Sequence, residues 1–482
     1  MIIHLNFLPK PGETGAGDVL AALFALLDQG RLDAELLPHL RLHLDWIQYK
    51  ANFREPVTVR HAADARGERM ALAELAVDLR RAPRDGLIDG LGRALASVGA
   101  IERETSGRVV VEDWVPLGES SIWQFNRLFW QRLADWERQS GRGFEAALPS
   151  GRSDANDPAA VADAVGDFWT LLVELDKRGQ LPAEIFALEI GVGSGTRAGL
   201  WLDRFKAIDE ARATGFYPRL RFLLADYSLP TLDRAMSAVE AHRDVVSMIA
   251  TDALNPLRAL SFLRYKILYV HLTNVYDNLP VDELVRRDGQ LYLVETRAYL
   301  PGPAAQAIAS SHGVGPTELR PTIARLLETG PDLFGDRERG VAFWRAVWDG
   351  LCLEERLRRL EGTADVPLPP GLHGDDLDEL LETAPADIRF HISRGAVESF
   401  VNTVPLLHPR GYLQVQDIFV ATMDEYRQGF RGPGKLDGSV VNWVNGALLQ
   451  AVGARTGYDV HFAPFRYRAG SRTSILYTTL RE

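Results

Sequence analysis

A turn rich in glycine follows a short apolar segment in the middle of the sequence, and its residue types suit a nucleotide-like ligand. The segment Phe186–Ile190 contains Glu189, and the turn after it carries Gly191, Gly193 and Gly195. An apolar run bounded by glycines is typical of a strand buried in a parallel sheet. Glycine lets the backbone turn sharply and lets a ligand approach, and the helix that follows directs its positive end at the turn. The pattern therefore predicts a binding loop of the nucleotide type.

Three ligand classes use such turns, and their motifs differ in the residues near the last glycine. A phosphate-binding NTPase loop ends in Gly-Lys-Ser/Thr, whereas this chain has Gly195-Thr-Arg, which excludes that class. A dinucleotide site has its third glycine one residue later, where Thr196 stands. The spacing Gly-x-Gly-x-Gly, preceded by Glu189, resembles the first motif of class I S-adenosylmethionine (SAM) methyltransferases. The resemblance implies that the acid and the turn accept the methionine moiety and sugar edge of SAM.

Acids that follow later apolar segments extend this resemblance. Asp226, with Tyr227 after it, stands where the family holds both ribose hydroxyls, and a carboxylate accepts two such hydrogen bonds. Asp252 and Ala253 are similar to the pair that recognises the adenine amino group. The segment Leu406–Gly411 resembles the family's Leu-Leu-x-Pro-Gly-Gly turn. An aspartate in such a place is often only a helix cap, but four matches in sequence order predict SAM as the cofactor.

A narrower resemblance covers roughly residues 185–482. The segment Tyr276–Val281 and the partial match Gly411–Asp417 are similar to MidA-type methyltransferases, which include protein-arginine methyltransferases that assist assembly of respiratory complex I. The chain departs from that family at Asn274, where the family has glutamate, and at Ile418, where it has tyrosine. The resemblance implies kinship of architecture more than identity of substrate.

The residues at and after the end of the predicted strand 266–274 are the candidates for catalysis, because that end of the sheet faces the methyl group of SAM in the family. They are Asn274, Tyr276 and Asp277. We predict that Asp277 orients or deprotonates the acceptor, and the alternative is that it caps the turn that follows. His271 stands at an alternating position within an apolar predicted strand, so it is interpreted as a core histidine. Secondary candidates for holding a cationic substrate are Glu295 and Asp417.

The elements that must position these residues alternate between strand and helix, which predicts a parallel sheet with right-handed crossovers. The predicted fold class is α/β, with a Rossmann-like class I methyltransferase sheet whose last strand is antiparallel, a helical N-terminal domain and a helical insertion. The predicted divisions are a helical, possibly winged-helix-like domain (1–115), a helical lead-in or lid (116–180), the first part of the SAM-binding core (181–300), a helical cap over the ligand crevice (301–390) and the second part of the core (391–482).

The lead-in is rich in aromatic residues and ends in a polar loop. Its aromatics suit either a platform for stacking a base or core packing, and core packing is favoured because Leu128 and Leu133 are interleaved with them at helical spacing. The loop Gly141–Pro158 predicts a boundary or a mobile lid. The aromatic residues are Trp123, Phe125, Phe129, Trp130 and Trp136.

Composition limits the partners. The net charge is −11, so direct nucleic-acid binding is not expected, and the single cysteine, Cys352, indicates a reducing compartment. We predict a cytoplasmic protein with no membrane segment and no signal peptide, and a homodimer is one option for its assembly. No spacing of His and Cys suits a metal, so no metal ligand is predicted.

Three functions remain open from the sequence. The first is methyl transfer to nitrogen, possibly arginine in a protein. The second is O- or N-methylation of a small molecule. The third is an assembly factor with a SAM-binding fold and a decayed catalytic loop, which the departure at Asn274 keeps open.

Overall fold

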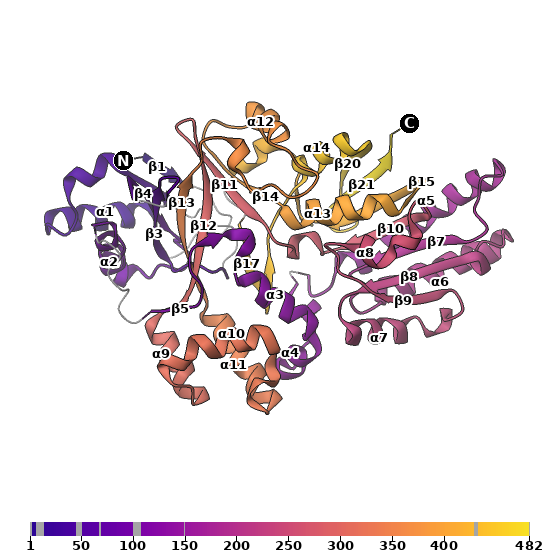
Figure 1. Ribbon diagram of the computed structural model, residues 1–482, viewed down its shortest axis with the longest axis horizontal. Helices are drawn as coiled ribbons and strands as arrows, with labels where there is room; N and C mark the ends of the chain where they lie inside the picture. The colour runs from indigo at the N-terminus through magenta and orange to yellow at the C-terminus, as the bar shows by residue number, and fades with distance from the viewer. Residues whose placement is uncertain are drawn as a thin grey trace.

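The computed structural model of the protein describes residues 2–5, 14–44, 51–66, 69–99, 108–148, 150–428 and 432–481. Two large sheets dominate it (Figure 1), one of seven strands and one of ten. The seven-stranded sheet lies on the right of the view, the N-terminal strands lie on the left, and the helices α3 (Ile122–Gln131) and α4 (Leu133–Ser140) lie between them.

The seven-stranded sheet carries the glycine turn. Its strands, in sheet order, are β20 (Tyr458–Pro464), β21 (Ser474–Leu480), β15 (Leu407–Asp417), β10 (Ile267–Thr273), β7 (Ile185–Ile190), β8 (Leu220–Asp226) and β9 (Val246–Ala250). Only β21 is antiparallel to its neighbours. Numbered along the chain, the strands lie in the order 3-2-1-4-5-7-6. The predicted class I methyltransferase sheet with an antiparallel last strand is therefore confirmed.

Helices cover both faces of this sheet, because side chains of successive strand residues point to opposite faces. Ala187 packs under the helices of one face, and Leu188 packs under those of the other. The first face carries α5 (Pro158–Lys177), α6 (Thr196–Arg212) and α7 (Leu229–Ala238), and the second carries α8 (Pro256–Leu260), α13 (Arg394–Thr403) and α14 (Gly446–Thr456).

The ten-stranded sheet joins the N-terminal region to the segment that follows β10. Its strands, in sheet order, are β1 (Ile2–Leu5), β2 (Leu40–Leu44), β4 (Arg69–Val77), β3 (Val57–Ala63), β13 (Cys352–Arg359), β12 (Gln290–Leu300), β11 (Asp282–Arg287) and β14 (Ile388–Ile392), while β5 (Val109–Val110) and β6 (Val115–Pro116) pair with β12. Two short pairs complete the strands, β16 (Phe419–Val420) with β19 (Val444–Asn445) and β17 (Gly434–Leu436) with β18 (Ser439–Val441).

The prediction of a mainly helical, winged-helix-like domain over residues 1–115 is wrong. The helices that the structure describes in this region, α1 (Ala16–Asp28) and α2 (Leu87–Gly99), pack on β2, β3 and β4. The apolar residues of the segment 33–46 have the spacing of a helix, yet residues 40–44 form β2, because pairing with distant strands overrides a local pattern. The sequence around Ser106-Gly107 favours a hairpin, but these two residues lie outside the described residues.

The segment 301–390 is not purely helical. Its helices are α9 (Gly302–His312), α10 (Leu319–Thr329), α11 (Arg337–Gly350) and α12 (Gly374–Thr383). They are interleaved with β13 and β14, which lie within or at the edge of the ten-stranded sheet. The helix α11 packs on α4, where the rings of Trp136 and Trp344 lie 4.7 Å apart. Core packing of Phe125, Phe129 and Trp136 is thereby confirmed.

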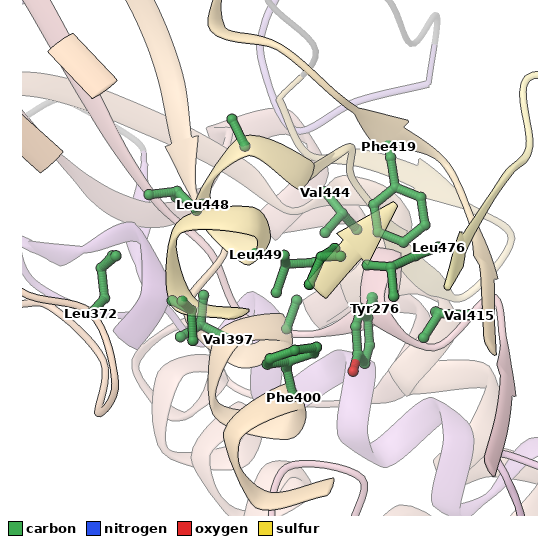
Figure 2. Packing of buried hydrophobic residues seen from close by; sticks show 14 of the residues in the cluster. Tyr276, Leu372, Val397, Phe400, Val415, Phe419, Val444, Leu448, Leu449 and Leu476 are labelled. Carbon is green, nitrogen blue, oxygen red and sulfur yellow. The ribbon is translucent and has the colours of Figure 1, made fainter. Parts of the chain in front are cut away.

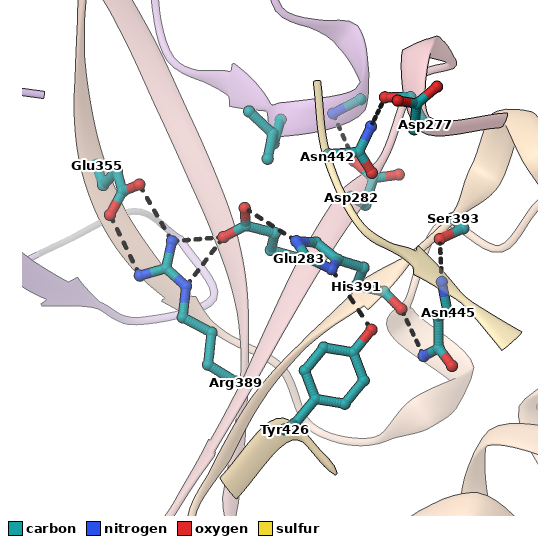
Figure 3. Close-up of polar contacts among 12 residues, drawn as sticks. Asp277, Asp282, Glu283, Glu355, Arg389, His391, Ser393, Tyr426, Asn442 and Asn445 are labelled. Carbon is teal, nitrogen blue, oxygen red and sulfur yellow. Dashed lines mark hydrogen bonds and ion pairs between the residues drawn. The ribbon is translucent and has the colours of Figure 1, made fainter. Parts of the chain in front are cut away.

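Charged side chains cross the ten-stranded sheet in a buried row (Figure 3). The guanidinium of Arg389 lies between Glu283, which accepts a hydrogen bond of 2.9 Å from Nε, and Glu355, whose Oε1 lies 3.1 Å from Nη2. Arg60 continues the row, with Nε 2.7 Å from Glu355 and Nη1 2.9 Å from Glu74. Burial acts to raise the pKa of Glu355, but the neighbouring guanidinium groups dominate and lower it. Alternating charge compensates the desolvation of each group.

The Glu355→Gln variant is expected to lower the free energy of unfolding by about 2 kcal/mol, because the arginines lose a charged hydrogen-bond acceptor in a buried site. Urea denaturation measures the change. The control is Glu354→Gln, the next residue of β13, whose pair with Arg297 is partly exposed. We expect that variant to cost less than about 1 kcal/mol. Equal losses in the two variants would contradict the interpretation.

Candidate functional site

A cavity of about 420 Å³ lies at the carboxyl ends of the strands of the seven-stranded sheet. The turn after β7 and the residues that follow β8, β9 and β10 form its floor, and α3 with residues 144–156 forms the opposite wall. Ligands of open α/β sheets bind at this edge, where the strand order reverses. The reversal falls between β7 and β10, as Figure 1 shows.

The three glycines of the turn have different structural roles, although all have positive φ. A Cβ atom on Gly191 would lie 2.5 Å from Val275, and one on Gly195 would lie 2.7 Å from the Cα atom of Ala235 in α7. Gly193 has φ +55° and no atom that such a Cβ would approach. Gly191 and Gly193 line the cavity, whereas Gly195 does not. The glycine at 193 therefore leaves room for a ligand, and the one at 195 allows α6 and α7 to pack.

Glu189 lies at the floor of the cavity and is paired with Arg197 of α6. Nη1 of Arg197 donates to Oε2 of Glu189 at 2.9 Å, and both side chains are about 95% buried. Burial raises the pKa of Glu189, and the charge of Arg197 opposes that rise. The other carboxylate oxygen, Oε1, has no hydrogen-bond partner within the described ranges. The predicted site residue is thus present, with a cation that already neutralises it.

Asp226 and Tyr227 line the cavity beside the glycine turn. Oδ1 of Asp226 accepts a hydrogen bond from the backbone N–H of Ser228 at 2.9 Å. Burial raises the pKa of Asp226 to about 6, although backbone N–H donors, including that of Gly193, oppose the rise. The carboxylate is thus charged at neutral pH and keeps capacity to accept further hydrogen bonds.

Asp252 and Ala253 line the cavity after β9. Oδ1 of Asp252 accepts the backbone N–H of Leu254 at 3.0 Å, and Oδ2 lies 3.7 Å from Nη2 of Arg127 in α3. The exposed fractions of the Arg127 and Asp252 side chains are 62% and 42%. Asp252 therefore both caps its own turn and connects the floor of the cavity to the α3 wall.

Of the three predicted catalytic residues, Asn274 lines the cavity and the other two do not. Asn274 has φ +50°, a left-handed conformation that asparagine tolerates better than most residues. Tyr276 is 1% exposed and points into the hydrophobic core among Phe400, Phe419 and Leu449, as Figure 2 shows. Tyr276 is therefore not placed to touch a ligand.

Asp277 is also directed away from the cavity, which contradicts our assignment of it as the residue that deprotonates the acceptor. Its backbone carbonyl accepts hydrogen bonds from Asn442 (Figure 3). Its Oδ1 accepts a hydrogen bond from Asn278. Asp417 at the end of β15 accepts the backbone N–H groups of Tyr276 and Asp277 at 2.9 and 3.2 Å. Burial first, and then the neighbouring Asp417 charge, raises the pKa of Asp277 well above its usual value. These carboxyls shape the loop that follows β10 and do not reach into the cavity.

Comparison with known proteins adds little to this geometry. No protein-family model matches the chain, and no curated protein matches it. A solved structure from Burkholderia thailandensis, bound to S-adenosylhomocysteine, is 12% identical with a TM-score of 0.44, over 76% of this chain and 88% of that one. The CcbJ methyltransferase from Streptomyces caelestis is 12% identical with a TM-score of 0.32, over 74% and 99%. These values are too low to carry an argument about function.

Several residues that the sequence did not single out also line the cavity. Thr273 follows His271 in β10, Thr251 follows β9, and Asn278 lies in the loop after β10. The hydroxyl of Thr251 and Oδ1 of Asn278 are buried without a hydrogen-bond partner within the described part of the chain. His271 is fully buried and hydrogen-bonded, so its interpretation as a core histidine is confirmed. Thr273 could have been identified from the sequence, because polar residues alternate with apolar ones along β10 and therefore share one face of the strand.

The wall opposite the sheet comes from the lead-in and not from the insertion. Trp123 and Trp130 of α3, with Phe144 and Leu148, line the cavity, so part of the aromatic segment faces the ligand space. Described residues of the polar loop 141–158, from Phe144 to Asn156, thus line the cavity, and the role of this loop as a mobile lid stays a prediction. None of the residues 301–390 lines the cavity, so the prediction that this segment hangs over the crevice is wrong. Its helices α9, α10 and α11 pack instead against α3 and α4, whereas α12 and β14 pack in the core that contains α13 and α14.

Proposed function

We propose that the protein is a SAM-dependent methyltransferase that transfers the methyl group to a nitrogen atom. The observation that carries the proposal is the position of Asp226. This carboxylate ends β8, lies beside the glycine turn after β7, and faces one cavity of a sheet with the class I methyltransferase order. A charged acceptor at that place suits the two hydroxyls of a ribose.

The remaining floor residues fit the other parts of SAM. Asp252 would accept the adenine amino group, with Tyr227 beside the base, and Oε1 of Glu189 would accept the ammonium of the methionine tail. Arg197 is engaged by Glu189, so the turn offers no free cation for a phosphate. The carboxylates of the cavity floor, which accept hydrogen bonds, therefore fit a ligand that carries a sulfonium and no phosphate.

SAM supplies an activated methyl group with a good leaving group. The protein must hold the acceptor nitrogen in line with the carbon–sulfur bond and exclude water. The aromatic wall of Trp123, Trp130 and Phe144 covers the floor and supplies that exclusion. Glu119 and Glu145 also line the cavity and favour an acceptor of positive or neutral charge over an anion.

This site is compatible with two classes of methyl acceptor and with one function that involves no methyl transfer. Arginine in a protein is the acceptor that the MidA resemblance implies. A small molecule is favoured by the enclosure of the cavity between the sheet and the aromatic wall. The third possibility is a scaffold that binds SAM without turnover, because the loop after β10 presents no carboxylate to the cavity.

Calorimetry with SAM and S-adenosylhomocysteine tests the cofactor, and binding of NAD instead would overturn the proposal. Incubation of cell lysate with methyl-labelled SAM tests the reaction. Label in the protein fraction identifies a protein acceptor, and label in the small-molecule fraction identifies the alternative. Binding of both cofactor forms with no label transferred would identify a scaffold.

The cellular setting remains a prediction. We propose a cytoplasmic protein without membrane or nucleic-acid partners, and the single cysteine and the acidic charge support this. No helix in the described part of the chain combines the length and apolar character needed to cross a bilayer. A homodimer stays a prediction, which light scattering would test.

The Gly193→Ala variant is expected to keep its fold and to lose SAM affinity by at least tenfold. A methyl group there meets no protein atom, but it occupies the space through which the ligand approaches. Alanine at φ +55° also carries backbone strain, which the control below shares at φ +78°. Calorimetry measures the affinity, and thermal unfolding measures the fold. The matched control is Gly195→Ala, which places its methyl group against Ala235 and is expected to lower the unfolding temperature. An unchanged affinity in Gly193→Ala would remove the glycine turn from the binding site.

A further inference from the structure

A chain of buried hydrogen bonds leads from the Glu189–Arg197 pair to the hydroxyl of Thr273 at the cavity. Nη2 of Arg197 donates to the hydroxyl of Tyr269 at 2.6 Å, and that hydroxyl donates to Oε1 of Gln414 at 2.8 Å. His271 lies next in the chain, with Nδ1 3.1 Å from the same Oε1 and Nε2 2.6 Å from Oγ1 of Thr273. Every member of the chain except Thr273 is buried, and both ends of the chain line the cavity.

The direction of the last hydrogen bond follows from the others. Nδ1 of His271 lies 3.1 Å from Oε1 of Gln414, which only accepts, and 3.2 Å from the hydroxyl of Tyr269, whose proton is directed at that same Oε1. A proton on Nδ1, donated to Oε1, satisfies these contacts. A neutral imidazole then has a lone pair on Nε2, which accepts the hydroxyl proton of Thr273. Burial, and then the charge of Arg197, lowers the pKa of His271 well below its usual value, so the ring remains neutral. Oγ1 of Thr273 therefore presents only lone pairs to the cavity.

The register of the sheet places this oxygen near the reacting end of the cofactor. Leu272 is paired with Ile190 of β7, so Thr273 lies level with the start of the glycine turn. A cofactor held by its ribose at Asp226 and by its tail at the turn extends from β8 across β7 toward β10. Thr273 is the last residue of β10 and faces the space that the acceptor must occupy.

We propose that Thr273 is a positioning residue that accepts a hydrogen bond from an N–H of the methyl acceptor, so that the site takes a nitrogen nucleophile that bears hydrogen. The proposal rests on the proposed function and names its substrate class. The nitrogen lone pair forms the bond to the methyl carbon, and the carbon–sulfur pair leaves with sulfur as a neutral thioether. The nitrogen becomes cationic and its N–H more acidic, so the hydrogen bond to Thr273 strengthens in the transition state. The surplus proton is then lost to water, because the neutral His271 holds its hydrogen bond and takes no proton.

Sinefungin, a SAM analogue with an amine in place of the methyl sulfonium, tests this without knowledge of the acceptor. We expect the wild type to bind sinefungin more tightly than S-adenosylhomocysteine, which has no group at that point. Thr273→Val should bind sinefungin about tenfold more weakly than the wild type, since one hydrogen bond is removed. Its affinity for S-adenosylhomocysteine should be unchanged. Thr273→Ser, which keeps the hydroxyl, should retain both affinities.

Each other outcome has a defined meaning. Unchanged sinefungin affinity in Thr273→Val, with S-adenosylhomocysteine still bound, overturns the role of Thr273 alone. A wild type that binds neither compound overturns the proposed function. If the valine variant fails to fold, the ¹⁵N shifts of His271 in the wild type decide. A proton on Nδ1 supports the proposal, and a proton on Nε2 overturns it.

Discussion

The Asp226→Ala variant is expected to bind SAM roughly 100-fold more weakly than the wild type, a loss of about 3 kcal/mol. The proposed cofactor gives two ribose hydroxyls to this carboxylate, and each bond to a charged acceptor contributes about 1.5–3 kcal/mol. Titration calorimetry measures the affinity. The control is Asp233→Ala on the exposed surface of α7, which should leave the affinity unchanged.

The pH dependence of the same affinity gives a second measure of Asp226. The pKa of this carboxyl is raised to about 6, so the charged form that accepts both hydroxyls is lost as the pH falls through that value. Affinity for SAM should therefore be constant above about pH 7 and fall below about pH 6, by up to tenfold per pH unit. In Asp226→Ala the part of the decline that begins near pH 6 should disappear. A decline of the same shape in the variant would assign the titration to another group, such as Glu189.

The residues that form the floor of the cavity could be predicted because their signals are local. Glu189 and the glycines are adjacent in sequence, and Asp226 and Asp252 directly follow the apolar segments that form β8 and β9. The parallel direction of the core strands followed from the alternation of strands and helices, and the class I type of sheet followed from the family resemblance. Each of these inferences needs only a few neighbouring residues and the rule that carboxyl ends of parallel strands meet at one edge.

The acceptor half could not be predicted in the same way. Whether Asn274 or Asp277 faces the cavity depends on Asp417 and Asn442, which lie far along the chain and fix the loop after β10. Spacing alone does not show that contact. The N-terminal strands were missed for a related reason, since buried charged residues such as Arg60 and Glu74 replace the apolar pattern that identifies a core strand.

Arg197 had a signal that sequence reasoning did not use. It lies eight residues after Glu189, in the first turn of the helix that follows the glycines. A cation placed there can reach back to the acid at the end of the preceding strand. Its presence changes the net charge expected at the turn, because the charge of Glu189 is already balanced before any ligand binds.

The Arg197→Met variant is therefore expected to lower the free energy of unfolding by about 3–5 kcal/mol, because Glu189 is left as a buried carboxylate without its cation. SAM binding should be lost with it, since the same carboxyl lines the cavity. Urea denaturation measures the stability. Arg204→Met, in the exposed part of α6, is the control and should change the stability by less than about 0.5 kcal/mol.

The double variant Glu189→Gln/Arg197→Met separates the ion pair from the packing of the two side chains. Removal of both charges leaves no unpaired carboxylate, so part of the lost stability should return relative to Arg197→Met. Arg197→Lys should not restore it, because one ammonium does not supply the two directed bonds that the guanidinium makes to Glu189 and Tyr269. If the double variant is less stable than Arg197→Met, then Glu189 is stabilised by something other than this arginine. In that case the charge of Glu189 at the glycine turn is available in full to the ammonium of the proposed cofactor.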